Sequence, residues 1–167
     1  MEADKVVDIG HVHLNVSDLD RSIAFYQAAL GLDVVLRMPK LAFLSYDGYH
    51  HHVALDSRAA ATRGAPEQQG LHHFAVRHET RSELADSVRR AQAAGVPIKR
   101  AADFYVLEAV FIDDPDGNGI ELSWDRPRDS WADDWATPTG LGTPRPLDLD
   151  GLLAAGSLTS SDGKRSR

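Results

Sequence analysis

The chain of 167 residues carries a formal net charge of −7 and is 43% hydrophobic, a length that suffices for one domain with a buried core. The acidic balance argues against nucleic acids and anionic membranes as partners, and no apolar run approaches the ~20 residues that cross a bilayer. The absence of cysteine excludes disulfides, thiolate metal ligands and a cysteine nucleophile. Because the N-terminus lacks the basic and apolar regions of a signal peptide, we expect a cytoplasmic protein.

The first half of the chain predicts one strand, one helix and three further strands. Residues 6–16 alternate between apolar and polar side chains, which predicts a strand with His11 on its polar face. Ser17 with Asp20 resembles a capping box and predicts the start of a helix, which Gly31 would end. The three further strands are predicted at 32–36, 40–46 and 49–55.

The second half repeats this order. Residues 71–77 predict a strand that places His73 on its polar face. Thr80 with Glu83 forms a second capping-box pattern, and Gly95 would end the helix that follows. Three more strands are predicted at 96–99, 107–112 and 119–124.

This internal repeat of βαβββ units predicts an α+β fold in which two modules, residues 6–56 and 70–126, pair around a shared cleft. Each unit has a helix on one side only, so its polar strand faces stay uncovered and can line that cleft. We therefore predict a single domain over 1–126 with a connector at 57–69. A C-terminal arm that ends in a disordered tail would occupy 127–167.

Polar residues of three strands then suggest a metal site. Glu121 follows a tight turn at 114–119 and lies on the polar face of the last strand. His11, His73 and Glu121 thus occupy matching places in the two modules. Two imidazoles and one carboxylate with open positions form the ligand set suited to Fe(II) and similar divalent ions. Any one of them alone would more often be a surface group, but their joint occurrence across the repeat favours a metal site.

A second histidine cluster comprises His50, His51 and His52. Alignment of the Asp-Gly turns in the two modules places His52 opposite Glu121, as a fourth ligand or a proton-transfer group, because imidazole titrates near neutral pH. Alternation directs His50 and His52 toward the cleft and His51 toward the helices, unless a bulge intervenes. The structural alternative is that one or two of them form hydrogen bonds within the fold.

Three ordered motifs resemble the vicinal oxygen chelate superfamily, which includes glyoxalase I, the fosfomycin and bleomycin resistance proteins and the extradiol catechol dioxygenases. The motifs are GHVHLNVSDLDRSIAFY at 10–26, LHHFAV at 71–76 and DPDGNGIE at 114–121. Within this family, YHHHVAL at 49–55 and ELSWDRP at 121–127 look most like the catechol 2,3-dioxygenase branch. The resemblance covers residues 8–126 and implies paired βαβββ modules.

The resemblance also implies a divalent metal on His11, His73 and Glu121. In that branch the metal is usually Fe(II); Mn(II), Ni(II) and Zn(II) are the other candidates. A catecholate would chelate it, O2 would take an adjacent position, and the ring would open beside the diol. His51 or His52 matches the histidine of the fourth strand that assists proton transfer. A homodimer is expected, from the family and because small barrels leave edge strands to cover.

The chain departs from the branch at two positions. Phe104 and Phe111 stand where the branch usually carries a His and a Tyr that orient the catecholate; Tyr105 could replace one of them. Three functions stay open: an extradiol-type dioxygenase acting on a catechol-like aromatic; a glyoxalase-like or thiol-transfer metalloenzyme, with His52 as its fourth ligand; and a resistance protein that binds an aromatic drug. Activity without oxygen would indicate the metalloenzyme that resembles glyoxalase. Tight binding of an aromatic ligand by metal-free protein would indicate the resistance protein.

Overall fold

A computed structural model describes residues 9–58, 71–133 and 143–156. In it, the first module forms a four-stranded sheet of order β1-β4-β3-β2, in which β1 runs parallel to β4 and the other neighbours are antiparallel. Its elements are β1 (Val12–Asn15), α1 (Leu19–Leu30), β2 (Asp33–Arg37), β3 (Leu41–Ser45) and β4 (Val53–Asp56). This is the predicted βαβββ order.

The second module repeats this order in a five-stranded sheet, β5-β8-β7-β6-β9, whose last strand comes from the C-terminal arm. The elements of the module are β5 (His73–His78), α2 (Arg81–Ala93), β6 (Arg100–Asp103), β7 (Leu107–Asp113) and β8 (Gly119–Asp125). Those of the arm are a short 3-10 helix (Arg128–Ser130), β9 (Arg145–Pro146) and α3 (Leu149–Ala154). The predicted α+β fold of two paired modules is confirmed.

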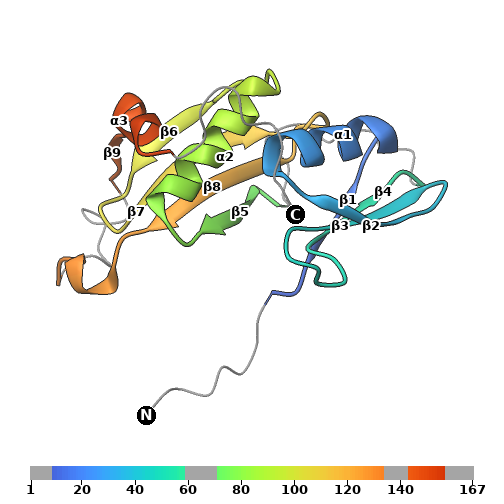
Figure 1. Ribbon diagram of the computed structural model, residues 1–167, viewed down its shortest axis with the longest axis horizontal. Coiled ribbons are helices and arrows are strands. Elements are labelled where there is room, and N and C mark those ends of the chain that lie inside the picture. Colours follow the sequence, from blue (N-terminus) through green and yellow to red (C-terminus); the bar gives the residue numbers. More distant parts are fainter. Residues whose placement is uncertain (1–8, 59–70, 134–142, 157–167) are drawn as a thin grey trace, which may run out of the picture.

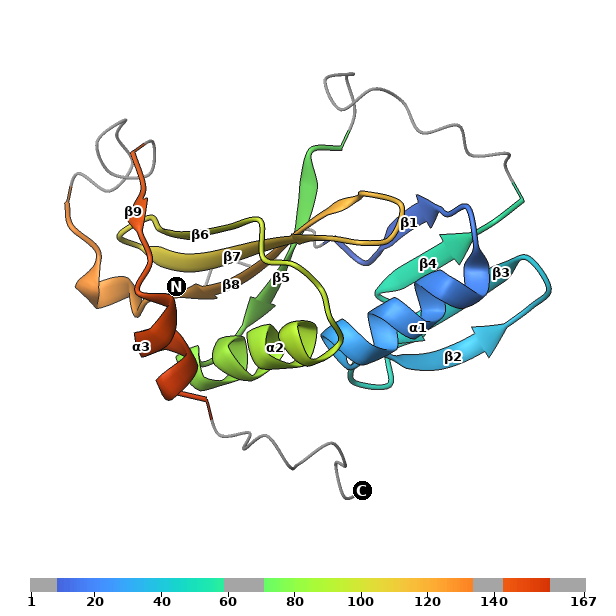
Figure 2. The same cartoon turned by 90° about the horizontal axis from the view of Figure 1, so that it is seen from above.

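Both module helices lie on the same side of the two sheets (Figure 1). Seen from above, α2 and α1 follow one another along the molecule and are in contact (Figure 2). The core lies between helices and sheets; its largest fully buried side chains include Tyr26, Leu44, Leu55, Leu84 and Ile120. Because the helices cover only one side of the sheets, the opposite sheet faces are free to carry the polar side chains.

No helix within the described ranges is long and apolar enough to span a lipid bilayer.

Some predicted segments fall on residues that the structure does not describe. They are the first residues of the strand predicted at 6–16, nearly all of the connector at 57–69, residues 134–142 of the predicted arm, and the tail beyond residue 156. The division into a domain at 1–126 and an arm with a disordered tail at 127–167 therefore stays a prediction.

The strand predicted at 96–99 is wrong. The chain there forms no strand, and β6 begins only at Arg100. The Val96 amide still donates to the Ala91 carbonyl of α2 at 2.9 Å, and Pro97 has no amide hydrogen for a ladder. The end of the helix and the proline together delay the strand.

One of the two predicted capping boxes is present. At α2, Thr80 and Glu83 bond each other's backbone amides, as predicted. At α1 the prediction is wrong, because Asp18 caps the helix in place of Ser17. The Ser17 hydroxyl instead donates to Asp116, in the turn between β7 and β8, at 2.5 Å.

That turn fastens the second module onto the first. Asp114 in the turn accepts hydrogen bonds from the amides of Asp116 at 2.9 Å and Asn118 at 2.8 Å. Its other carboxylate oxygen accepts the hydroxyl of the buried Tyr26 from α1 at 3.0 Å. Burial, reinforced by the Asp114 carboxylate, raises the pKa of Tyr26 far above its ordinary value, so this hydroxyl stays a donor. The clamp ties the start of β8 to α1.

Replacing Tyr26 with Phe is expected to lower the free energy of unfolding by about 1–2 kcal/mol, because the buried Asp114 oxygen loses a donor. Urea denaturation measures this change. Tyr46→Phe is the matched control, since Tyr46 is 59% exposed and its loss of a hydroxyl should change stability by less than about 0.5 kcal/mol. Equal effects of the two substitutions would contradict the clamp.

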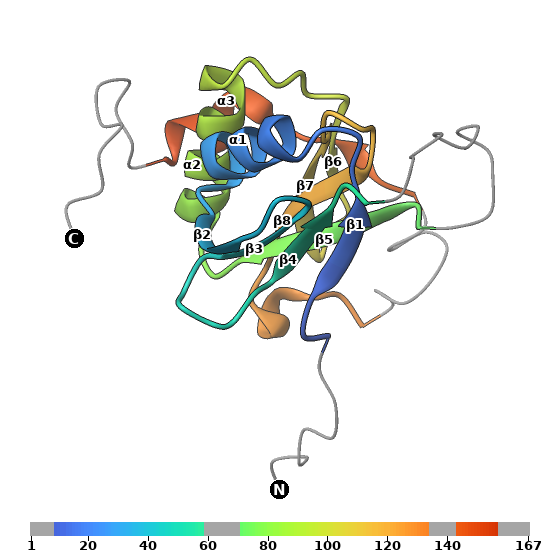
Figure 3. The same ribbon diagram turned by 90° about the vertical axis from the view of Figure 1, so that its right-hand side faces the viewer.

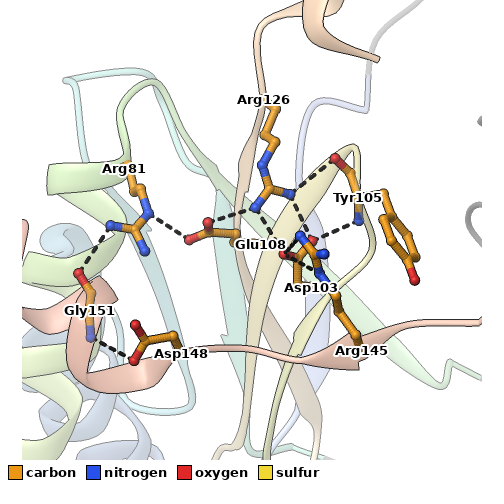
Figure 4. A network of polar contacts seen from close by, with 8 residues as sticks. All are labelled: Arg81, Asp103, Tyr105, Glu108, Arg126, Arg145, Asp148 and Gly151. Atoms are coloured by element: carbon orange, nitrogen blue, oxygen red, sulfur yellow. Dashed lines mark hydrogen bonds and ion pairs between the residues drawn. The ribbon is translucent and has the colours of Figure 1, made fainter. Parts of the chain in front are cut away.

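The C-terminal arm is held on the second module by two buried carboxylates, Asp103 and Glu108, each 5% exposed (Figure 4). Arg126 bridges them, at 2.8 Å from Asp103 and 2.9 Å from Glu108. Arg145 of the arm also binds Asp103 at 2.9 Å. Arg81 joins Glu108 at 2.8 Å to the backbone of α3 at 3.1 Å. The arm is thus attached by charge-assisted contacts of Arg145 and Arg81, and Arg89 of α2 adds hydrogen bonds to the Leu153 carbonyl at 2.7 and 3.1 Å.

Candidate metal centre

A cavity of about 580 Å³ is lined by residues of both modules. Its walls come mainly from the approach to β1 in the first module and from β5 in the second, which are edge strands of their sheets; Figure 3 shows these two strands from the side. His11 and His52 line it from the first module, and His73 lines it from the second. The cavity therefore brings histidines of the two modules to one space.

His73 and Glu121 form the most complete part of the site. They lie on the neighbouring parallel strands β5 and β8, and the His73 Nε2 atom is 3.0 Å from the Glu121 Oε2 atom. The Glu121 side chain is only 14% exposed. Burial raises the pKa of Glu121 above its ordinary value, and the neighbouring His73 offsets part of this rise. A largely buried carboxylate next to an imidazole is a suitable pair of ligands for a divalent cation.

His11 lies on the wall formed by the other module. Its ring packs against His51, with the two ring centroids 4.3 Å apart. Within the described ranges, no cluster of three or more histidine and carboxylate side chains is arranged to hold a metal ion. The structure thus brings His73 and Glu121 together and leaves His11 in the wall of the cavity that His73 also lines. The three-residue site remains a prediction.

Strand alternation predicts that His51 faces the helices, and this prediction is wrong. Its ring stacks on Phe43 with centroids 4.3 Å apart and planes at 12°, and it also contacts His11. The Nδ1 atoms of His50 and His51 are 2.7 Å apart. β4 begins only at Val53, so alternation does not extend back over the histidines. Burial, followed by the charges of His11 and His50, lowers the pKa of His51.

His52 lines the cavity and is oriented by its neighbours. Its Nδ1 atom is 3.1 Å from the Ser45 hydroxyl oxygen, and its ring stacks on Tyr46 with centroids 3.8 Å apart. Its other ring nitrogen lies 3.8 Å from Asp47. A histidine ring held in this way can exchange a proton with a ligand in the cavity. The catalytic role of His52 stays a prediction.

Tyr105 lies apart from the His73–Glu121 pair. It sits in the turn between β6 and β7, which lies beside Asp125 at the far end of β8. At the usual rise per residue, Asp125 is about 13 Å along the strand from Glu121. The Tyr105 backbone adopts a left-handed φ of 68°, held by an amide hydrogen bond to Asp103 at 2.8 Å. The Arg145 guanidinium lies over its ring at 4.9 Å (Figure 4). Its catalytic role stays a prediction without a contact to the pair.

Sequence reasoning missed Arg100, because it placed the strand at 96–99. In the structure Arg100 pairs with Phe111, and Phe111 pairs with Glu121. Directly opposed residues share a face of a sheet, so all three lie on the face of the candidate ligands. The Phe111 ring contacts His73 edge-on with centroids 5.6 Å apart. Extending the alternation of β7 to its antiparallel neighbour would have found Arg100.

Comparison with known proteins agrees with this architecture. Residues 8–122 match the model of the Glyoxalase/Bleomycin resistance protein/Dioxygenase superfamily. The chain is 35% identical over 147 residues to a catechol-2,3-dioxygenase of Bacillus subtilis (strain 168), covering 87% of this chain and 50% of that protein. It is 31% identical over 116 residues to biphenyl-2,3-diol 1,2-dioxygenase 2 of Rhodococcus globerulus, covering 69% of this chain and 61% of that protein. The chain thus spans about half to three fifths of the length of these relatives.

Solved structures show the same fold at lower identity. A glyoxylase/bleomycin resistance protein/dioxygenase domain from Frankia sp. EAN1pec aligns with a TM-score of 0.60 and 21% identity, covering 72% of this chain and 99% of that one. A lactoylglutathione lyase from Agrobacterium tumefaciens aligns with a TM-score of 0.56 and 24% identity, covering 70% of this chain and 92% of that one. These likenesses concern the fold alone. By its sequence match and its paired βαβββ modules, this chain belongs to the glyoxalase/bleomycin resistance protein/dioxygenase superfamily.

Proposed function

We propose that the chain is a metal-dependent, extradiol-type ring-cleaving dioxygenase that uses Fe(II) and O2 on a catechol-like aromatic. The observation that carries the proposal is the His73–Glu121 pair, 3.0 Å apart, with His73 in the wall of a cavity shared by two modules. The reaction type is supported by the similarity to proteins named catechol-2,3-dioxygenase and biphenyl-2,3-diol 1,2-dioxygenase.

The residues that would hold the metal are His73, Glu121 and His11. The first two fit, because imidazole nitrogen and carboxylate oxygen are donors that Fe(II) accepts. The proposal requires His11, which lines the same cavity, to join them when the metal binds. A bound divalent ion with open positions supplies Lewis acidity and a place where a vicinal diol and a small molecule can bind side by side. Mn(II), Ni(II) or Zn(II) could occupy the same donors.

His52 in the cavity wall, and His51 and Phe111 next to the histidines of that wall, would handle the substrate and its protons. His52 lines the cavity with its ring held by Ser45, so it can accept a proton from a diol hydroxyl. His51 touches His11 and could pass a proton on from there. Phe111 stands edge-on to His73 and offers an apolar surface for an aromatic ring. A cytoplasmic location and a homodimer remain predictions.

Oxygen uptake tests the proposal. The protein is purified anaerobically, loaded with Fe(II), and mixed with substituted catechols and with the matching meta-diols. We expect equimolar consumption of O2 and catechol with a yellow ring-opened product, and no uptake with the meta-diols, which cannot chelate through adjacent oxygens. Uptake should be lost when the iron is removed and return when it is added back.

The proposal would be contradicted if no catechol of the panel caused O2 uptake while the protein demonstrably retained iron. Ni(II)- or Zn(II)-loaded protein that turns over a thiol adduct without oxygen would point instead to glyoxalase-like chemistry. Tight binding of an aromatic ligand by metal-free protein would favour a sequestering role. Each outcome therefore selects one of the functions that the sequence leaves open.

A further inference from the structure

Arg100 occupies a distinctive place on the open face of the second sheet. It is the first residue of β6 and lies directly opposite Phe111, which lies opposite Glu121. The three side chains form a row across the sheet, on the face turned away from α2. The residues next to Phe111 and Glu121 along their strands, Ile112 and Ile120, point to the other face and are buried in the core. At the usual strand spacing, the Arg100 backbone is about 10 Å from that of Glu121.

Two aromatic rings hold the Arg100 guanidinium. Its central carbon lies 5.7 Å from the centroid of Phe104 and 5.6 Å from that of Phe111, which is the range of cation–π contacts. These are the two phenylalanines at which the chain departs from the catechol 2,3-dioxygenase pattern. In place of polar groups that touch a substrate directly, the chain has two rings that position a cation.

The charge of Arg100 has no carboxylate partner among the residues that the structure describes. Other arginines on this module do: Arg77 pairs with Asp125, while Arg81, Arg126 and Arg145 pair with Asp103 or Glu108. Arg100 is solvent-exposed and presents its planar fork of N–H donors on the face of the candidate metal ligands. Such a fork matches the two oxygens of a carboxylate.

We propose that Arg100 determines substrate specificity by binding a carboxylate on the catechol-like substrate, at the end of the ring remote from the diol. This inference rests on the proposed function and adds the class of substrate: an aromatic diol that also carries an anionic group. The diol end would lie at His73 and Glu121, the ring over Phe111, and the carboxylate at Arg100. The chain carries a net charge of −7, so a local cation is needed to bind an anionic ligand.

The test compares two ligands that differ in one group: a catechol with a carboxylate para to one hydroxyl, and the same catechol with a methyl group there. Dissociation constants are measured by calorimetry on the Fe(II)-loaded protein with oxygen excluded. We expect the carboxylate ligand to bind about ten- to hundredfold more tightly than the methyl ligand, as expected for hydrogen bonds between charged groups. This preference should shrink as ionic strength rises.

Arg100→Gln should remove the preference and leave the affinity for the methyl ligand unchanged. Arg100→Lys should restore only part of it, because an ammonium group lacks the planar fork. Arg37→Gln is the control for the lost charge: Arg37 lies on β2 of the other module and pairs with Asp20, so the preference should persist.

Equal affinity for the two diols, or a preference that survives Arg100→Gln, would overturn the role of Arg100 while the proposed function stands, since both diols still bind. Failure of both diols to bind iron-loaded protein would overturn the proposed function and this inference with it.

Discussion

Glu121→Gln is expected to lower the affinity of the protein for Fe(II) at least about 100-fold. Even the loss of a residue that only hydrogen-bonds to a metal ligand lowers metal affinity about 10–100-fold, and Glu121 is proposed to be a ligand itself. The substitution keeps the shape of the side chain and its contact with His73 but removes the anionic donor. Metal content after dialysis against graded Fe(II) measures the change. His73→Ala should have the same effect on iron retention and should also abolish O2 consumption.

His11 and His13 provide a matched comparison for this prediction. His11→Gln should weaken Fe(II) binding as Glu121→Gln does, if metal binding draws His11 from the opposite wall of the cavity. His13, two residues along, lies 3.6 Å from Asp56 and has a 45% exposed side chain, so His13→Gln should leave the affinity unchanged. A His11 variant that binds iron like the unaltered protein would remove His11 from the ligand set, and retention of iron by Glu121→Gln would sink the site itself.

Local patterns predicted most of the fold, because the elements obey local rules. Strand alternation placed His73 and Glu121 on polar faces, and the two side chains meet at 3.0 Å. Both predicted helix stops, Gly31 and Gly95, adopt left-handed φ angles of 70° and 75°. These features depend only on the near sequence, so a single chain is enough to find them.

The failure at the start of α1 arose because a distant residue competes with a local signal. Ser17 looks like a helix cap, but Asp116, 99 residues away, takes its hydroxyl. Asp18 then caps the helix in its place. No local pattern contains that competition, and the corresponding Asp-Gly turn of the first module gives no hint of it, since Asp47 accepts the nearby amide of Tyr49. The clamp between modules is a property of the tertiary fold.

The site was harder to predict than the fold, because register decides which side chains share a face. β4 starts at Val53 rather than at residue 49, and this change turns His51 onto Phe43 and His11. A delay of the strand predicted at 96–99 likewise hid Arg100. Pairing of strands is a long-range property, and a shift of one residue reverses the face of every side chain.

Asp103→Ala is expected to lower the free energy of unfolding by about 2–4 kcal/mol, near the cost of breaking a buried ion pair. The Asp103 side chain is only 7% exposed and pairs with Arg126 and Arg145. Its removal leaves Arg126, 21% exposed, with one of its two carboxylate partners, Glu108, and takes from the arm the ion pair made by Arg145. The value lies below that of fully buried pairs, because Arg145 is 57% exposed. Guanidinium denaturation measures the loss.

The same contacts make this part of the stability sensitive to acid. Burial alone would raise the pKa of Asp103, but hydrogen bonds from Arg126, the Tyr105 amide and Arg145 outweigh it and hold the pKa below its ordinary value. A carboxyl whose pKa is lower in the folded state stabilises the protein above its ordinary value of 3.8 and loses this contribution as the pH falls through the folded pKa. Stability of the unaltered protein should therefore fall more steeply below about pH 4 than that of Asp103→Ala.

Asp125→Ala, which breaks the exposed pair with Arg77 at 3.4 Å, should cost less than about 1 kcal/mol. If the two alanine variants lose equal stability, or if acid affects Asp103→Ala as strongly as the unaltered protein, the network does not anchor the arm.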